Sequence, residues 1–329
     1  MSLSLAIVFL LVCASVFVNG WTDSPNAIAT VVSTRVLKPK TAIAMAAVFN
    51  LLGVFLMGNA VAKTMGEIVD IGQGQEALVA LGAAQLSIVL WSTAAWKFGI
   101  PTSESHALIA GLMGAGISFK GAEAFNMDSV MKVLYGLVIS SVVGFVLGFI
   151  ATKLVEALFY NANRRRANRF FSGGQIASAM LLAFSHGAQD GQKFVGVMNL
   201  ALAIGGLATL GEVQPFTMVL VSLIMAVGTS VGGYRIIKTM GMDMVKLEKH
   251  QGFAAEVVAS ASMLAATWFG IPLSTTNTKA TAMMGAGASK SIGAVNWGIA
   301  KEMLMAWVLT FPACTLLGYL FATFFRMIF

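Results

Sequence analysis

Long apolar segments alternate with short polar connectors along the whole chain. None of them shows the alternation of apolar and polar residues that is typical of a strand, so each predicts a helix. Many approach 20 residues, the length that a helix needs to cross a bilayer. The pattern therefore predicts an all-α polytopic membrane protein. The apolar segments lie at approximately 3–19, 41–62, 77–98, 102–118, 129–160, 174–184, 192–210, 215–234, 252–269, 273–289 and 298–328.

The composition agrees with this fold class. Hydrophobic residues make up 57% of the chain and charged residues 11%, with a mean hydropathy of +0.82, whereas soluble domains carry about 25% charged residues. Segment 3–19 has no basic start and no small-residue cleavage site, so we expect a retained helix rather than a signal peptide. Cys13 and Cys314 lie in separate apolar segments, which argues against a disulfide.

The two halves of the chain repeat each other. The stretch "GIPTSESH" begins at residue 99 and "GIPLSTTN" begins at residue 270. With an offset of 171, ten of the 21 positions in 98–118 are identical to those in 269–289. In each half an aspartate precedes this stretch. The sequence therefore predicts an internal duplication in which each half carries one proline-led hydroxyl run.

Charge gives the orientation of the halves. Lys and Arg gather in three connectors, at 35–40, 161–170 and 235–249. The net charge of +7 fits the positive-inside rule better than nucleic-acid binding, so we place these loops in the cytoplasm and expect no nucleic-acid partner. The protein is then a multi-pass protein of the cell (inner) membrane, with both termini on the side away from the cytoplasm. The second half runs opposite to the first, an inverted-topology repeat that is common in secondary transporters.

We divide the chain accordingly. Residues 1–160 form a first inverted repeat, 161–173 a basic cytoplasmic linker and 174–329 a second inverted repeat. Each repeat contains a helical hairpin, at 77–118 and 252–290, which enters the membrane and returns. Hydropathy leaves open whether these hairpins span the membrane fully or re-enter partway.

Polar residues interrupt one apolar helix in each half. "NGWTDSPNAIATVVST" (19–34) contains Pro25, which disfavours helix before it. "SHGAQDGQK" (185–193) divides the corresponding helix of the second half. We predict two broken helices with freed carbonyls and inward-facing aspartates, because ionised residues inside membrane segments are costly and usually functional.

The hydroxyl runs predict an anion site. Proline is well placed in the first turn of a helix, and the residues after it present free N–H groups, hydroxyl donors and the positive end of the helix dipole. Two such helix starts that face each other could hold a tetrahedral oxyanion. The predicted phosphate-binding residues are Thr102, Ser103, Ser105, Ser274, Thr275 and Thr276.

An anion beside aspartates requires cations. Carboxylate, amide and hydroxyl oxygens are hard ligands that suit an alkali ion, whereas protons on the carboxylates are the alternative. We predict sodium at Asp23 and Asp190, with the amides of Asn26, Gln189 and Asn277 as further ligands. No cofactor and no other metal is expected.

Six further polar residues are candidates for gating or an auxiliary role. The histidines could carry protons or act as hydrogen-bonding scaffold residues. The lysines could offset an aspartate or the anion, or extend to the membrane interface. These residues are Glu104, His106, His186, Lys193, Glu256 and Lys279.

These motifs resemble those of the PiT inorganic phosphate transporters over nearly the whole chain. "GWTDSPNAIATVVSTRVL" and "SHGAQDGQKFVGVM" resemble the two signature segments of the family, and the two hairpin stretches resemble its hairpins. The resemblance implies cation-coupled phosphate symport, inverted repeats with two re-entrant hairpins, and a homodimer. Thr22 and Gln189 stand where the usual signature has asparagine, a departure that bears on the choice of ion and the stoichiometry.

The sequence therefore predicts a sodium-coupled phosphate symporter that works by alternating access, and not an enzyme. A proton-coupled phosphate symporter and a sulfate permease of the same fold are the alternatives. An intramembrane hydrolase using Ser185, His186 and Asp190 is disfavoured, since sequence neighbours rarely form a triad. The duplication also counts against a hydrolase, which has no need of two equivalent helix starts. A pore is a further alternative, which uptake that never exceeds the electrochemical gradient of the anion alone would favour.

Overall fold

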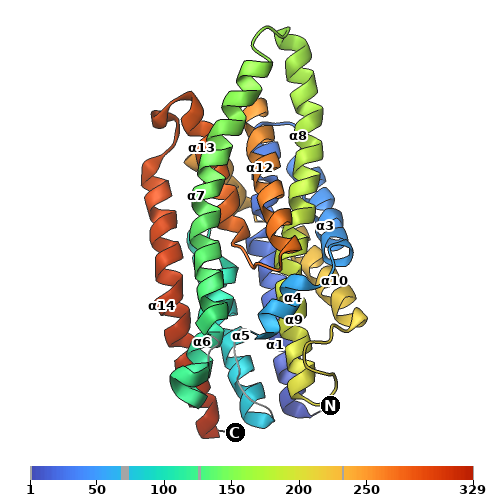
Figure 1. Cartoon of the computed structure of the whole chain (residues 1–329), viewed down its shortest axis with the longest axis vertical. Helices are drawn as coiled ribbons and strands as arrows, with labels where there is room; N and C mark the ends of the chain where they lie inside the picture. The colour runs from blue at the N-terminus through green and yellow to red at the C-terminus, as the bar shows by residue number, and fades with distance from the viewer. Residues whose placement is uncertain (1, 68–73, 125–126, 232, 329) are drawn as a thin grey trace.

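The computed structural model describes residues 2–67, 74–124, 127–231 and 233–328 (Figure 1). Parts of the predicted first repeat, at 68–73 and 125–126, lie outside the described residues. The described residues are almost entirely helical, and their only β-structure is an isolated bridge between Val245 and Val295. The helices are α1 (Leu3–Thr22), α2 (Ala29–Ser33), α3 (Pro39–Leu56), α4 (Ala60–Glu67), α5 (Gln75–Phe98), α6 (Glu104–Lys120), α7 (Met127–Leu158), α8 (Arg164–His186), α9 (Gln192–Ile204), α10 (Pro215–Val231), α11 (Tyr234–Lys238), α12 (Lys249–Trp268), α13 (Thr275–Lys290) and α14 (Trp297–Ile328).

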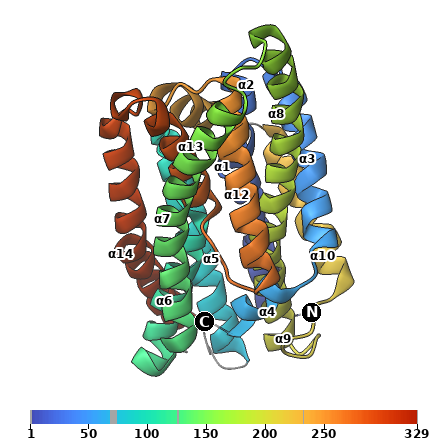
Figure 2. The same ribbon diagram turned by 45° about the horizontal axis from the view of Figure 1, so that its top comes forward.

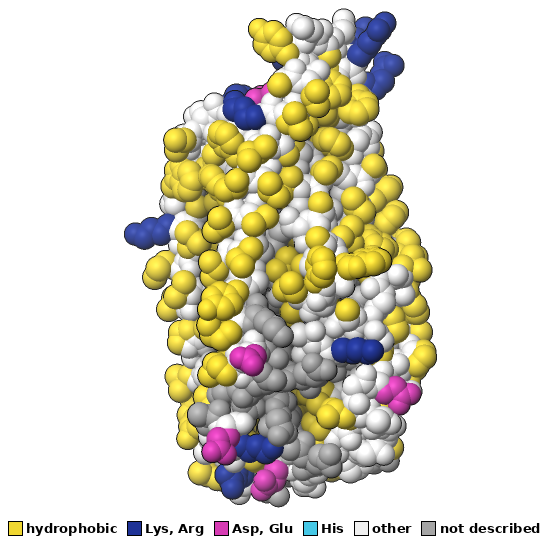
Figure 3. All heavy atoms as spheres, viewed as in Figure 1, with side chains coloured by type: hydrophobic (Ala, Val, Ile, Leu, Met, Phe, Trp, Pro, Cys, Tyr) yellow, Lys and Arg dark blue, Asp and Glu magenta, His cyan; other side chains and the backbone are white. Residues whose placement is uncertain are grey.

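The surface is that of a membrane protein. Apolar side chains cover the middle of the face in Figure 3, and most charged side chains on that face lie toward its two ends. Among the described residues, five helical segments are long and apolar enough to cross a membrane, and α10 with the bent stretch after it would make a sixth. The five are Leu3–Ser33, Pro39–Leu56, Gln75–Phe98, Leu134–Leu158 and Trp297–Ile328.

The two predicted breaks are changes of helix type. After α1, a 3₁₀ turn over Ser24–Ile28 leads into α2, with Pro25 in its first turn. Between α8 and α9, a π-helical turn covers Gly187–Gly191. We predicted unwound segments with freed carbonyls, but the chain remains helical through both. In apolar surroundings an unwound backbone would leave N–H and C=O groups without partners. A change to the hydrogen-bond spacing of a 3₁₀ or π turn interrupts the α-helix and costs less free energy.

Two boundaries differ from the predicted segments. The predicted segment 41–62 consists of two helices, because α3 ends at Leu56 and Gly58 adopts a left-handed φ of 77° before α4. The predicted linker 161–173 is mostly helix. The Asn163 side chain accepts a hydrogen bond from the N–H of Arg165 at 3.0 Å, and α8 begins at Arg164.

The two hairpins, α5–α6 and α12–α13, meet tip to tip. Gly99 and Gly270 have left-handed φ values of 71° and 66°, which turn the chain after α5 and α12. Ser103 and Ser274 cap α6 and α13, and the Ser274 hydroxyl donates to the Ser103 hydroxyl at 2.8 Å. From this contact α6 extends into the lower half of Figures 1 and 2 and α13 into the upper half. The inverted relation of the two whole halves stays a prediction.

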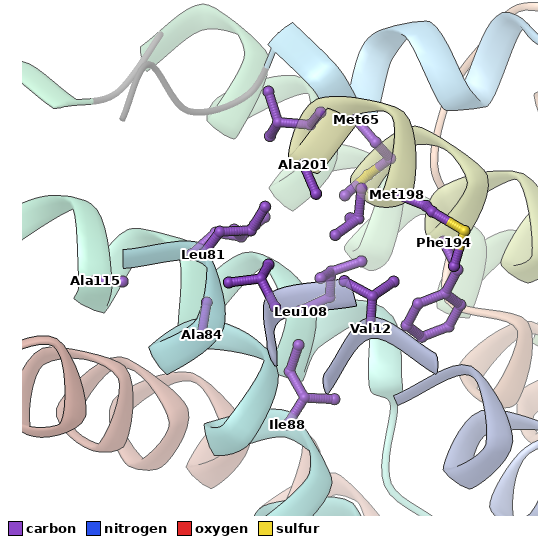
Figure 4. Packing of buried hydrophobic residues seen from close by; sticks show 14 of the residues in the cluster. Val12, Met65, Leu81, Ala84, Ile88, Leu108, Ala115, Phe194, Met198 and Ala201 are labelled. Carbon is purple, nitrogen blue, oxygen red and sulfur yellow. The ribbon is translucent and has the colours of Figure 1, made fainter. Parts of the chain in front are cut away.

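Two apolar clusters lie on either side of the breaks. One contains Val16 of α1 and Phe194 of α9, and Figure 4 shows part of it, with Leu81 of α5 and Leu108 of α6 beside Phe194 and other residues of α9. The other contains Ala27 and Ala183. Each interrupted helix thus contributes to one cluster before its break and to the other cluster after it. The polar residues of both breaks consequently lie at the boundary between the clusters.

Close backbone packing beside the π turn yields a first prediction. A Cβ added to Gly187 would lie 2.0 Å from the backbone oxygen of Asn50 in α3, whereas one added to Gly173 meets nothing within 4 Å. Because α3 would have to move away from the site, we expect Gly187→Ala to lower the free energy of unfolding by about 1–3 kcal/mol. Gly173→Ala, in the same chain segment, should change it little. Thermal unfolding in detergent measures both, and equal stabilities would contradict this packing.

Candidate functional site

The predicted site residues come together where the breaks and the hairpin tips meet. All of the predicted phosphate- and sodium-binding side chains belong to residues that are at most 5% exposed. They come from the break after α1, the π turn between α8 and α9, and the first turns of α6 and α13. Segments far apart in the sequence therefore enclose one polar region between two apolar clusters.

Asp190 is the centre of one hydrogen-bond network. Its Oδ1 accepts from the Lys193 ammonium at 2.7 Å, and its Oδ2 accepts from the Thr275 hydroxyl at 2.9 Å and the Asn19 amide at 3.3 Å. His186 Nε2 lies 3.3 Å from the same Oδ2. The negative charge of Asp190 is thus balanced within the protein by Lys193.

Lys193 joins this carboxylate to both hairpin tips. Its ammonium donates to the Ser105 hydroxyl of α6 at 2.6 Å and also to the carbonyl of Leu273, which precedes α13. Ser105 in turn donates to the Leu273 carbonyl at 3.2 Å. Lys193 therefore bears a buried positive charge at the junction of the tips.

Asp23 and Glu104 form the other side of the site. The Asp23 carboxylate interacts with the hydroxyl of Thr276 and with the backbone of Glu104. The Glu104 carboxylate accepts from the Thr22 hydroxyl at 2.6 Å. Among the described residues, no Lys, Arg or His forms a salt bridge with either carboxylate. A buried charge without a partner is costly, so these two acids require a cation or protons.

Some side-chain oxygens of the first interrupted helix and the first hairpin tip lack a hydrogen-bond partner among the described residues. Among the described residues, the side-chain oxygens Asn19 Oδ1, Asn26 Oδ1 and Glu104 Oε2 are buried without a hydrogen-bond donor. The Asn26 amide nitrogen already donates to the Thr276 hydroxyl at 2.9 Å. Carboxylate and amide oxygens are ligands for hard cations. This donor set fits an alkali ion between the first break and the two tips.

The hairpin tips are joined by their own polar groups. Ser274 Oγ lies 2.8 Å from both Ser103 Oγ and Asn277 Oδ1, and it accepts from the N–H of Asn277 at 3.1 Å. Ser103 accepts from the N–H of His106 at 3.3 Å. Thr102 is buried in the loop before Ser103. The Asn277 oxygen is thus engaged with Ser274, although it was predicted as a sodium ligand.

Gln189 lies against the second hairpin loop. Its amide nitrogen donates to the Thr267 hydroxyl at 2.9 Å and to the carbonyls of Met263 and Ile271, and its oxygen accepts from the N–H of Leu273 at 3.1 Å. Both ends of the amide therefore hold the loop. The Gln189 oxygen is occupied by the N–H of Leu273 in this conformation, and its role as a sodium ligand stays a prediction.

The remaining predicted residues occupy different places. His186 Nδ1 lies 3.0 Å from Asn50 Oδ1, and Asn50 donates to Ser24. His106 is buried against Phe311, and neither ring nitrogen has a hydrogen-bond partner among the described residues. Glu256 and Lys279 form a separate network further along α13.

Several polar residues of the site were not among the predicted site residues. Asn19 and Thr22 contact Asp190 and Glu104, and Asn50 contacts His186. The sequence carried a signal for Asn19, because it stands four residues before Asp23 as His186 stands four before Asp190. Asn50 carried none, since it is a single polar residue in an apolar segment.

Comparison with known proteins identifies the family. The chain matches the model of the phosphate transporter family over residues 19–318. It belongs to that family. The transporter is similar to a probable low-affinity inorganic phosphate transporter of Bacillus subtilis, with 37% identity over 98% of both chains. It is also similar to one of Rhizobium meliloti, with 39% identity over 92% of this chain and 91% of the relative.

A solved structure has the same fold. It is described as the sodium-dependent phosphate transporter, and it superposes with a TM-score of 0.93 at 20% identity over 100% of both chains. Together these similarities confirm the predicted resemblance, the helical membrane fold and phosphate as the substrate of the family. The relatives are named transporters and permeases, so the prediction that the chain is not an enzyme is also confirmed.

The Asp190–Lys193 pair yields a second prediction. Asp190→Asn leaves the Lys193 ammonium buried without its counter-charge, which should cost about 3–5 kcal/mol of unfolding free energy. The double variant Asp190→Asn/Lys193→Met removes both charges and should recover most of that loss. Denaturation of the purified transporter in detergent measures the difference.

The chain offers a matched control for this experiment. Lys290 and Glu248 are also 2.7 Å apart, but their side chains are 61% and 58% exposed. Glu248→Gln should therefore cost only about 0–1 kcal/mol. Equal losses for Asp190→Asn and Glu248→Gln would show that burial does not govern the Asp190 pair.

Proposed function

We propose that the transporter couples phosphate uptake to sodium by alternating access. The observation that carries this proposal is the contact between Ser103 and Ser274, which brings two helix N-termini together beside Asp23 and Glu104. Anion donors and cation ligands thus occupy one buried region. A symporter needs this adjacency, because each ion screens the charge of the other in a medium that solvates neither.

We place phosphate between the N-termini of α6 and α13. Both helices direct their unpaired N–H groups and dipoles toward the junction, and Ser105, Thr275 and Thr276 add hydroxyls there. Lys193 supplies a fixed positive charge. Hydrogen phosphate can donate a hydrogen bond from its O–H to a nearby carboxylate, whereas sulfate has no O–H to donate. A site that contains acceptor carboxylates therefore favours phosphate over sulfate.

We place sodium between Asp23 and Glu104. The unpartnered oxygens of Asn19, Asn26 and Glu104 support this position, and the solved structure of the same fold is described as sodium-dependent. The sodium predicted at Asp190 would share that carboxylate with Lys193. We therefore assign the coupling ion first to Asp23, which forms no salt bridge with a lysine among the described residues.

The way in which the site is closed supports alternating access. In this conformation the tips contact each other and the site residues are buried, so substrate exchange requires a hairpin to move. The hairpins extend from the contact toward opposite ends of the molecule (Figure 2). Separation of one hairpin from the junction would open the site to one side only. An inverted repeat, cytoplasmic basic loops and a homodimer remain part of the proposal.

A third prediction tests the phosphate site. Ser105→Ala and Thr276→Ala each remove a hydroxyl from the junction, and a hydrogen bond to a charged group contributes about 1.5–3 kcal/mol. We expect each variant to weaken the apparent affinity for phosphate by at least about 10-fold. The concentration dependence of phosphate uptake into proteoliposomes measures it. Ser289→Ala is the control, because that hydroxyl of α13 binds only the Ala286 carbonyl. Unchanged affinity in both variants would exclude the junction as the anion site.

A fourth prediction tests the coupling ion. An inward sodium gradient at equal pH should accumulate phosphate in proteoliposomes, and Asp23→Asn should abolish this accumulation because the carboxylate is the principal ligand. Asp243→Asn makes the same change at an exposed position and should have no effect. Accumulation driven by a pH gradient alone, without a response to sodium, would favour the proton-coupled alternative.

A further inference from the structure

A second buried acid and lysine lie outside the phosphate junction. Glu256 of α12 accepts hydrogen bonds from the hydroxyls of Thr30 in α2 and Ser178 in α8. The Lys279 ammonium of α13 donates to Thr30 at 3.2 Å and lies 3.9 Å from Glu256 Oε1. Glu256 and Lys279 are 0% and 1% exposed by side chain. Four helices thus enclose one carboxylate, two hydroxyls and one ammonium.

This group is the next layer of contacts beyond the junction. Asn26 contacts Thr276, and four residues further along the first interrupted helix Thr30 contacts Lys279, three residues further along α13. Residues three or four apart lie on the same face of a helix, one turn from each other. The same two segments that hold the proposed sodium ligand Asn26 therefore also hold Lys279 against Glu256.

The oxygens of the group belong to the classes that bind hard cations. A carboxylate and two hydroxyls supply hard oxygen ligands, the same classes of ligand as at Asp23. The Lys279 ammonium can donate three hydrogen bonds, yet among the described residues it forms only the one to Thr30. Both hydroxyls instead donate to the carboxylate, so the three oxygen-bearing side chains contact one another.

Structural stabilisation does not account for the pair. A buried ion pair is often no more stabilising than apolar residues of similar volume, and ionisable residues inside membrane segments usually serve function. Lys279 also lies on the hairpin helix that must move during transport, and Thr30 lies just beyond the first break. The contacts of Glu256 and Lys279 with Thr30 therefore join the second hairpin to the first interrupted helix, two parts that the proposed cycle separates.

We propose that Lys279 is a tethered cation, which fills a cation-binding site formed by Glu256, Thr30 and Ser178. This inference rests on the proposed function. If sodium is the coupling ion, a group of oxygens one helical turn from the junction would bind sodium when the Lys279 ammonium is absent. Lys193 plays the same part at Asp190. The second half thus carries its own counter-ions on lysine side chains, and mobile ions serve the acids Asp23 and Glu104.

The proposal predicts that removal of the ammonium creates a sodium site. Lys279→Met leaves the carboxylate and both hydroxyls in place, and should bind one more sodium ion per chain than the unaltered transporter. Equilibrium binding of radioactive sodium to purified protein without phosphate measures this number. Glu256→Gln/Lys279→Met removes the acid as well and should return to the original number. Lys290→Met removes an exposed lysine from the same helix and should change nothing.

The outcomes separate this proposal from the proposed function. An unchanged sodium number in folded Lys279→Met overturns the tethered cation, and Lys279→Thr, which adds a hydroxyl ligand, provides the same test if the methionine variant does not fold. Asp23→Asn, measured alongside, should lose one sodium ion if the coupling site is correct. A gain in Lys279→Met without a loss in Asp23→Asn would support the tethered cation and contradict the proposed sodium site.

Discussion

The cost of burying carboxylates in a membrane protein governs this structure. Asp23, Glu104, Asp190 and Glu256 are all nearly inaccessible to solvent, and a charge buried without compensation is far less stable than one in water. Each acid must therefore have a positive charge or a proton close by. The interrupted helices and the hairpins supply this compensation, because they bring hydroxyls, amides and two lysines from distant parts of the sequence to the same place.

Compensation is divided unequally between the two halves. Asp190 and Glu256, both in the second half, face Lys193 and Lys279. Asp23 and Glu104, both in the first half, have no such lysine among the described residues, and Glu104 Oε2 has no hydrogen-bond partner among them. In our proposal this asymmetry defines the ion coupling. The lysine ammonium groups remain attached to the chain, whereas the sodium ion at Asp23 and Glu104 is transported with phosphate.

The duplicated stretches also exchange chemical roles. With the offset of 171 residues, Glu104 corresponds to Thr275. Glu104 accepts from the hydroxyl of Thr22, which precedes Asp23, whereas Thr275 donates its hydroxyl to Asp190. Each tip thus pairs a carboxylate with a hydroxyl, but the acid lies on the tip in one half and on the interrupted helix in the other. The two hairpin tips are therefore chemically different, although serine caps the helix in both.

The sequence by itself determined the fold class and the family, and it indicated the buried polar residues that the structure brings together, because apolar length, local motifs and the repeat are visible in one dimension. It also indicated hairpin tips at Pro101 and Pro272. Only the tertiary structure decided which residues meet. The pairing of Lys279 with Glu256 and Thr30 depends on the packing of three helices, as does the engagement of Gln189 with the second hairpin loop. The form of the breaks was decided there too, since the need to pair backbone groups in apolar surroundings keeps both segments helical.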